Sequence, residues 1–188
     1  MKSVAVYLGS SAGRRPVYCE IAYEFGKRLA EKGFTLVYGG ASVGTMKAVS
    51  DGAHNAGGKV VGVFPRGFKG KSERHFTSQD ELISKSCTEV IFVADMAERK
   101  KVMSDLCDCC AILPGGWGTI DELSEHLVAR EIGKDDKPVF VLNVEGYYDT
   151  LKALALNMVE EGFLSPENLT NLVFCDSLDE LMAQICAC

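Results

Sequence analysis

The sequence has no long apolar run, fewer basic than acidic residues, and only three histidines. No stretch approaches the roughly 20 apolar residues that a membrane-spanning helix needs. The chain carries 20 Lys and Arg against 26 Asp and Glu, a net charge of −6, so it lacks the basic face that duplex nucleic acid or a membrane surface requires. We therefore expect no nucleic-acid partner and no membrane partner, although local backbone amides can still bind a small anion.

The amino-terminal apolar stretch, residues 3–8, is too short for the core of a signal peptide and runs directly into glycine and serine. We therefore expect a cytoplasmic protein with reduced thiols, and we interpret the eight cysteines as small core residues. Cys107 and Cys110 have C-x-x-C spacing, but no second such pair and no histidine pair follows. The sequence therefore predicts no metal site.

Short apolar runs alternate with helical periodicity along the whole chain, and 188 residues suit one domain, 1–188. The polar stretch 66–85 is predicted to be a mobile loop with a short helix. The alternation predicts an α/β fold, a doubly wound and mainly parallel sheet with helices on both faces. The predicted strands are 3–8, 34–38, 59–65, 89–93, 110–113, 138–143 and 173–174, and the predicted helices lie near 17–33, 46–57, 95–106, 119–132, 147–160 and 178–185.

Three loops of small residues follow three of these strands, at 9–13, 39–45 and 115–119. The carboxyl ends of parallel strands share one edge of a sheet, so the loops are expected to converge on one crevice that binds an anion or nucleotide. Their candidate binding residues are Gly9, Ser10, Ser11, Gly39, Gly40, Ser42, Gly44, Gly115, Gly116, Gly118 and Thr119.

The third loop has the layout of a phosphate site, a buried strand followed by glycines and a helix expected to begin near Thr119. Glycines let the backbone approach a ligand, and free N–H groups with the positive end of the helix dipole favour an anion. Asp121 and Glu122 fall in the first turn, where Glu122 can face the ligand. The alternative is a tight turn with Thr119 as the N-cap and Glu122 completing a capping box.

Neither common nucleotide fingerprint is complete. Gly39 and Gly44 have the spacing of a phosphate-binding Walker A loop, but Thr45 stands in place of its lysine, and no G-x-G-x-x-G follows the first strand. These absences disfavour a kinase-like ATPase and a dinucleotide dehydrogenase. The ionisable groups beside the loops suit cleavage of a glycosidic bond by a carboxylate and a cation; they are Asp95, Glu98, Arg99, Lys100, Asp121, Glu122 and His126.

Four motifs across nearly the whole chain resemble the Lonely Guy (LOG) family, whose members are also described as possible lysine decarboxylases. They are Gly9-Ser10-Ser11, Tyr38-Gly39-Gly40-Ala41-Ser42-Val43-Gly44, Asp95-Met96-Ala97-Glu98-Arg99-Lys100-Lys101-Val102-Met103 and Pro114-Gly115-Gly116-Trp117-Gly118-Thr119-Ile120-Asp121-Glu122. The resemblance implies a homodimeric Rossmann-like phosphoribohydrolase. Such an enzyme splits cytokinin riboside 5′-monophosphates, and often AMP, into free base and ribose 5-phosphate.

By motif matching, the resemblance places Arg99 and Glu122 at catalytic positions, with Met96 and Lys100 among the substrate-binding residues. Ala97 stands where the family usually has histidine, and the second loop also departs from the usual GGGSVGLMG. We set decarboxylation aside, because a pyridoxal enzyme needs a recognisable Schiff-base lysine. No cofactor is expected.

Two alternatives accompany this interpretation. Arg99 could be a surface charge paired with Asp95 one helical turn earlier, in which case it would have no role in a site. The chain could also be a non-catalytic Rossmann-like carrier of a nucleotide or molybdopterin-type cofactor. The histidines, His54, His75 and His126, are interpreted as surface or packing residues.

Overall fold

The computed structural model describes residues 2–66 and 82–188, and its centre is one seven-stranded sheet. Its strand order is β4-β3-β2-β1-β5-β6-β7, and every paired register is parallel. The predicted parallel α/β sheet is thus confirmed. The strands are β1 (Ser3–Tyr7), β2 (Thr35–Tyr38), β3 (Val60–Pro65), β4 (Glu89–Val93), β5 (Cys109–Ile112), β6 (Val139–Leu142) and β7 (Val173–Cys175).

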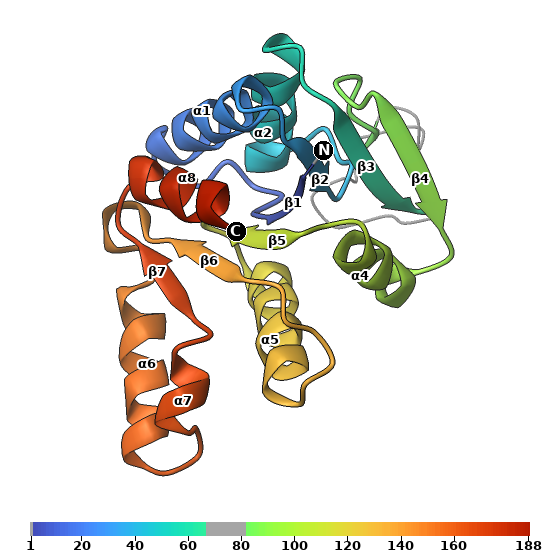
Figure 1. Ribbon diagram of the computed structural model, residues 1–188. Helices are drawn as coiled ribbons and strands as arrows, with labels where there is room; N and C mark the ends of the chain where they lie inside the picture. The colour runs from blue at the N-terminus through green and yellow to red at the C-terminus, as the bar shows by residue number, and fades with distance from the viewer. Residues whose placement is uncertain (1, 67–81) are drawn as a thin grey trace.

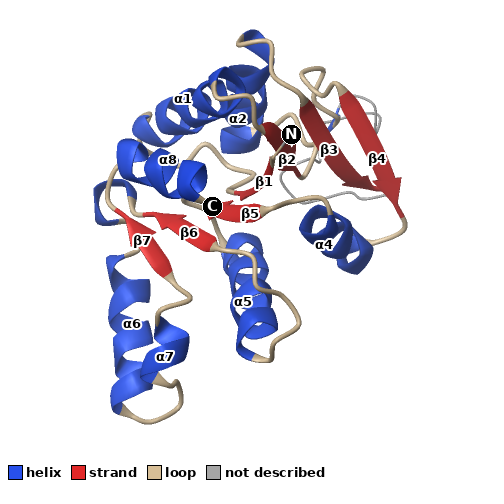
Figure 2. Ribbon diagram, in the orientation of Figure 1, coloured by secondary structure: helices blue, strands red, loops and turns tan. Residues whose placement is uncertain are grey.

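Helices cover both faces of the sheet, as Figures 1 and 2 show. Helices α1, α2 and α8 pack on one face, and α4, α5 and α6 lie on the other. The helices are α1 (Val17–Glu31), α2 (Gly44–Asn55), α4 (Met96–Asp105), α5 (Trp117–Glu131), α6 (Asp149–Glu160), α7 (Pro166–Leu169) and α8 (Leu178–Ala187). None of the described helices is long and apolar enough to cross a membrane.

The apolar runs form strands because both faces of the sheet are covered. Every residue of β2, β3, β5 and β6 is buried, which explains why these strands read as continuous apolar runs instead of alternating patterns. The strand order reverses at β1, which lies between β2 and β5. The carboxyl edge of these three strands is therefore the place where such a fold binds ligands.

Several boundaries differ from the sequence prediction. Helix α5 begins at Trp117 with Gly116 as its N-cap and no side-chain cap, so the predicted capping role of Thr119 is wrong. A short 3-10 helix, η2 (Val144–Gly146), precedes α6, and α7 was not predicted. Most of the predicted mobile loop at 66–85 lies outside the described residues; within the described part, Ile83 forms an antiparallel bridge with Ala41.

All eight cysteines are free thiols. Four of them are buried, as predicted, and two are partly buried. The prediction is wrong for Cys186 and Cys188, which are exposed, Cys186 in the last turn of α8 and Cys188 directly after this helix. Cys107 and Cys110 lie side by side, with their Sγ atoms 3.7 Å apart.

Candidate functional site

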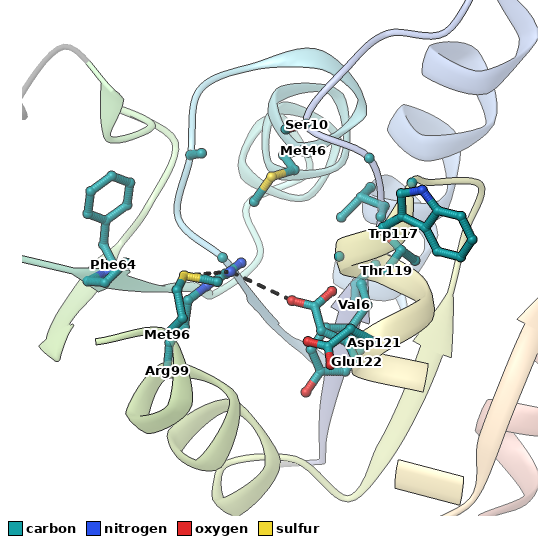
Figure 3. Close-up of a pocket in the computed structure, with 18 residues that line it drawn as sticks. Val6, Ser10, Met46, Phe64, Met96, Arg99, Trp117, Thr119, Asp121 and Glu122 are labelled. Carbon is teal, nitrogen blue, oxygen red and sulfur yellow. Dashed lines mark hydrogen bonds and ion pairs between the residues drawn. The ribbon is translucent and has the colours of Figure 1, made fainter. Parts of the chain in front are cut away.

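A cavity of about 390 Å³ lies at the carboxyl edge of the sheet, where the strand order reverses. It is bounded by the loops after β1, β2 and β5 and by the first turns of α4 and α5 (Figure 3). Ten residues that the sequence singled out line it together: Gly9, Ser10, Gly39, Met96, Arg99, Gly116, Gly118, Thr119, Asp121 and Glu122. The topology thus brings segments from four parts of the chain into one site.

The glycines of the loop after β5 differ in what surrounds them. A Cβ added at Gly115 would lie 2.1 Å from Thr119 Oγ1, so glycine is required there for the loop to close on its own helix. A Cβ at Gly116 or Gly118 would meet no protein atom within 4 Å among the described residues, and both positions border the cavity. The space beside these two glycines is therefore open to a ligand.

The first turn of α5 supplies hydrogen-bond donors to this space. Thr119 and Ile120 donate their N–H groups back to Gly116 O, both at 3.1 Å. The N–H groups of Gly116, Trp117 and Gly118 precede the first full helical bond and have no backbone partner in the described chain. Together with the helix dipole, these amides make a local environment that favours an anion.

Other residues predicted for the site lie outside this cavity. Ser11 and Gly115 line a smaller adjoining cavity of about 270 Å³. Gly40 packs on Gly62 and Phe64, and Ser42 N donates to Leu82 O at 2.7 Å.

Gly44 and Lys100 also lie elsewhere. Gly44 packs against the backbone of Ser10 and Ser11, and the neighbouring Thr45 donates through Oγ1 to Gly9 O at 2.7 Å. The Lys100 ammonium pairs with Asp121, which borders the cavity, and with Glu125, and Lys100 itself lines the second cavity instead. These residues build or flank the loops without facing the cavity.

Arg99 and Glu122 face one another across the cavity (Figure 3). Arg99 Nη1 lies 3.6 Å from Glu122 Oε1, and the two side chains are only 12% and 9% exposed. The alternative in which Arg99 is a surface charge paired with Asp95 is wrong, because Asp95 caps α4 by accepting from Glu98 N at 2.9 Å. Gly39 is needed for this arrangement, since a Cβ there would lie 1.8 Å from Arg99 Nη2.

Burial raises the pKa of Glu122 to about 7, and the Arg99 guanidinium only partly offsets this effect. Arg99 Nε is itself buried and is the one such side-chain N or O atom without a hydrogen-bond partner in the described chain. The carboxyl group is thus able to gain or lose a proton near neutral pH, beside a cation with spare donor capacity. Such a pair suits acid–base or charge-stabilising chemistry on a polar ligand.

The sequence analysis missed the apolar wall of the cavity. That wall is formed by Ala41, Met46, Phe64 and Pro65, together with the predicted Met96. Phe64 and Pro65 end β3, and strand ends at the reversal edge are the signal that could have pointed to them. Trp117 also borders the cavity, but it is 88% exposed and its ring turns away from Arg99 and Glu122 in Figure 3.

A second polar cavity lies behind Glu122. Only Tyr7 and Glu122 line both cavities, as far as the described residues show. His126 is buried there and its Nε2 lies 2.9 Å from Tyr7 Oη, so it is a packing residue, as predicted, while His54 is exposed. His75 lies outside the described residues. No group of three metal-ligating side chains occurs in the described ranges.

The parallel sheet and the cavity at its reversal edge define a Rossmann-like protein, and the glycine-bordered start of α5 beside the Arg–Glu pair is its candidate anion site. The family described as "Possible lysine decarboxylase" matches residues 46–185. Cytokinin riboside 5′-monophosphate phosphoribohydrolases LOG5 and LOG7 of Arabidopsis thaliana are each 39% identical over 98% of this chain, which covers 77% and 81% of their lengths. The chain belongs to this family, and the predicted LOG resemblance is confirmed.

Solved structures share the fold. The molybdenum cofactor binding protein of Rippkaea orientalis superposes with a TM-score of 0.73, at 21% identity, covering all of this chain and 97% of that chain. The molybdenum cofactor carrier protein of Chlamydomonas reinhardtii gives a TM-score of 0.72 at 20% identity, covering 99% of this chain and 96% of that chain. At these identities the likeness supports the Rossmann-like architecture alone.

Proposed function

We propose that this protein is a phosphoribohydrolase that cleaves the N-glycosidic bond of purine nucleoside 5′-monophosphates, AMP or cytokinin riboside 5′-monophosphates, into free base and ribose 5-phosphate. The observation that carries this proposal is the buried Arg99–Glu122 pair beside the open start of α5. The activity named for the relatives at 39% identity supports the same reaction. The cavity volume of about 390 Å³ is in the range of small-molecule sites.

The substrate phosphate is proposed to bind at the start of α5. The free N–H groups of Gly116, Trp117 and Gly118 would donate to its oxygens, with the hydroxyl of Thr119 close by. Each charge-assisted amide contact is worth roughly 1.5–3 kcal/mol. Nucleoside monophosphates should therefore bind much better than nucleosides. The base would lie on the apolar wall, between Phe64 and Met96.

Cleavage builds positive charge on the ribose ring while the base departs. Water supplies the oxygen that bonds to C1′, one of its protons passes through Glu122, and the leaving base gains a proton at the nitrogen that held the sugar. A carboxyl group with a pKa of about 7 can take that proton and release it at neutral pH. Arg99 stays protonated, so it binds the anionic substrate or orients Glu122 but cannot act as the acid.

The rival function is that of a carrier that holds a nucleotide or molybdopterin-type cofactor without cleaving it. A carrier has no evident need for a buried carboxylate at 3.6 Å from a buried arginine in its binding cavity, because that carboxylate costs desolvation energy and repels an anionic ligand. Incubation with AMP followed by chromatography separates the two functions. We expect adenine and ribose 5-phosphate in equal amounts; bound but intact AMP would favour the carrier.

We also propose a homodimer acting in the cytoplasm. The apolar content of the helix predicted over 95–106 favours it as the interface from sequence, but its Met103 is buried in the core. Exposed apolar side chains on α5 and α6 offer more, namely Val128, Ile132, Leu154, Leu156 and Met158. Light scattering should give about twice the 20.4 kDa chain mass at micromolar concentration, and a monomer would remove the proposal. The eight free thiols are compatible with a reducing compartment.

A further inference from the structure

Two consecutive tyrosines hold the carbonyl groups of the loop that follows β5. Tyr147 Oη donates a hydrogen bond to Gly115 O at 2.5 Å, and Tyr148 Oη donates to Leu113 O at 2.8 Å. Both tyrosines come from the segment between β6 and α6, more than thirty residues further along the chain. Neither has a role in the site described above.

The geometry of the peptide bond links Tyr147 to the cavity. The C=O of Gly115 and the N–H of Gly116 belong to one planar trans peptide and point in opposite directions. Tyr147 and Gly115 line the smaller cavity, whereas Gly116 also borders the cavity of Arg99 and Glu122. A carbonyl fixed toward Tyr147 therefore holds the Gly116 N–H pointing away from Tyr147, and Gly116 borders the larger cavity.

This peptide needs an anchor. It joins two glycines, so no side chain restricts its rotation, and a Cβ at Gly116 would touch no described atom. The hydrogen bond from Tyr147 is the one hydrogen bond that the described part of the chain makes to the Gly115 carbonyl. Without it, the Gly116 N–H would sample other directions and lose part of its value as a donor.

The segment that presents Tyr147 is itself held firmly. Asn143 Oδ1 accepts from Tyr148 N at 2.7 Å, and Asn143 Nδ2 donates to Asp149 at 2.8 Å. Glu145 has a φ of 47°, the one non-glycine residue of the described chain in the left-handed region, and its carboxylate pairs with Arg15. A side chain other than glycine is held there at some cost, which indicates that the surrounding contacts impose the conformation.

We propose that Tyr147 is a positioning residue for the phosphate site, which fixes the Gly115–Gly116 peptide so that the Gly116 N–H faces the bound phosphate. The identity of the anion, a nucleoside 5′-monophosphate, rests on the proposed function. The orientation of the amide does not, because it is a property of the free protein.

Tyr148 provides a matched control. Its hydroxyl donates to the carbonyl of Leu113, and the next residue is Pro114, so that peptide has no N–H to direct at a ligand. The same hydroxyl also contacts the Gly115 backbone, but the Gly115 carbonyl is bonded by Tyr147. Tyr148 is also buried, at 2% exposure, whereas Tyr147 is 41% exposed. Loss of the Tyr148 hydroxyl should therefore reduce stability without changing phosphate recognition.

The test measures the affinity of AMP, ribose 5-phosphate and adenosine by calorimetry for Tyr147→Phe and Tyr148→Phe, each in a Glu122→Gln background so that AMP is not consumed. For Tyr147→Phe we expect AMP and ribose 5-phosphate to bind about tenfold more weakly and adenosine to bind within twofold. For Tyr148→Phe we expect an unchanged ratio of AMP to adenosine affinity and a lower Tm.

A second readout separates positioning from direct contact with the ligand. Spectra of ligand-free, ¹⁵N-glycine-labelled protein should show the Gly116 amide resonance shifted in Tyr147→Phe and unshifted in Tyr148→Phe. An unmoved Gly116 resonance, or equal losses for AMP and adenosine, would overturn the proposal. Wild-type protein that binds AMP without releasing adenine would contradict the proposed function alone. Failure of the parent protein to bind AMP or ribose 5-phosphate would overturn the phosphate role of Tyr147 as well.

Discussion

The loops after β2 and β5 have similar compositions but serve different purposes. In the loop after β2, Gly40 and Gly44 have φ values of 75° and 51°, and a Cβ at Gly44 would lie 2.4 Å from the backbone of the first loop. Thr45 then ties the two loops together through Gly9 O. In the loop after β5, Gly116 and Gly118 adopt no left-handed conformation, and a Cβ added at either would meet no described protein atom within 4 Å.

The difference teaches that a glycine can make room either for the protein itself or for a ligand. The β2 loop uses its glycines to pack against neighbouring backbone and, at Gly39, against the Arg99 guanidinium. The β5 loop packs through Gly115 alone and leaves Gly116 and Gly118 beside open space. Both loops read as phosphate-binding candidates from sequence, but in the β5 loop the N–H groups of Gly116, Trp117 and Gly118 have no backbone partner in the described chain and lie beside the cavity.

The largest effect is expected at the β5 loop, from Glu122→Gln. If the carboxylate stabilises charge that exists only in the transition state, kcat for AMP should fall by a factor of about 10²–10³ with little change in affinity. Single-turnover rates and calorimetry measure the two quantities. Glu125→Gln is the matched control, since its 51% exposed carboxylate pairs with Lys100 and does not line the cavity, so it should change kcat less than about threefold. Comparable rates for Glu122→Gln and wild type would end the catalytic assignment.

The same carboxyl group should make stability depend on pH. Its folded pKa of about 7 lies above its ordinary value of 4.5, so the folded state binds more protons than the unfolded state between these values. Stability therefore falls as pH rises through this window, by up to about 3 kcal/mol from this group. Urea denaturation should give a lower free energy of unfolding at pH 8 than at pH 5 for the wild-type protein. The difference between the two pH values should be smaller for Glu122→Gln. Equal pH slopes for both proteins would contradict the raised pKa.

For the β2 loop, Gly44→Ala should lower the stability of the fold and leave the recognition of the ligand largely unchanged. The added methyl group would occupy a left-handed backbone position and clash with Ser10 and Ser11, at a cost of about 2 kcal/mol or more. Thermal denaturation should show a lower Tm, while protein that remains folded should keep its preference for AMP over adenosine. A stable Gly44→Ala protein that has lost this preference would make the β2 loop part of the ligand site.

Sequence reasoning predicted the parallel sheet and the cavity edge because buried strands and strand-end glycines have local signatures. It also paired Arg99 with Glu122 through motif matching, although 23 residues separate them along the chain. It could not distinguish Gly44, which packs against the protein, from Gly118, which borders open space, because residues distant in sequence decide what each glycine faces. The apolar wall at Phe64 was missed for the same reason, since a buried strand residue and a cavity residue have the same local pattern.

Gly118→Ala tests whether a bound ligand occupies the open space beside the β5 loop. Gly118 is the second residue of α5, where alanine is a better helix former by up to about 1 kcal/mol, and its Cβ would meet no described protein atom. We therefore expect an equal or higher Tm together with about tenfold weaker AMP binding, because the methyl group would intrude into the phosphate space. Unchanged AMP affinity would show that the ligand does not approach this glycine.

The smallest effect is expected from Ala97→His, which restores the residue usual in the family. Ala97 is exposed on the first turn of α4 and is not among the cavity-lining residues, although its neighbour Met96 is. An imidazole there would lie next to Met96, beside the proposed base position. The ratio of rates on AMP and an N6-substituted AMP should therefore change a few-fold, while the affinity for ribose 5-phosphate stays constant. An unaltered ratio of rates would show that residue 97 has no influence on base selectivity. A change in ribose 5-phosphate affinity would place the phosphate nearer to α4 than to the β5 loop.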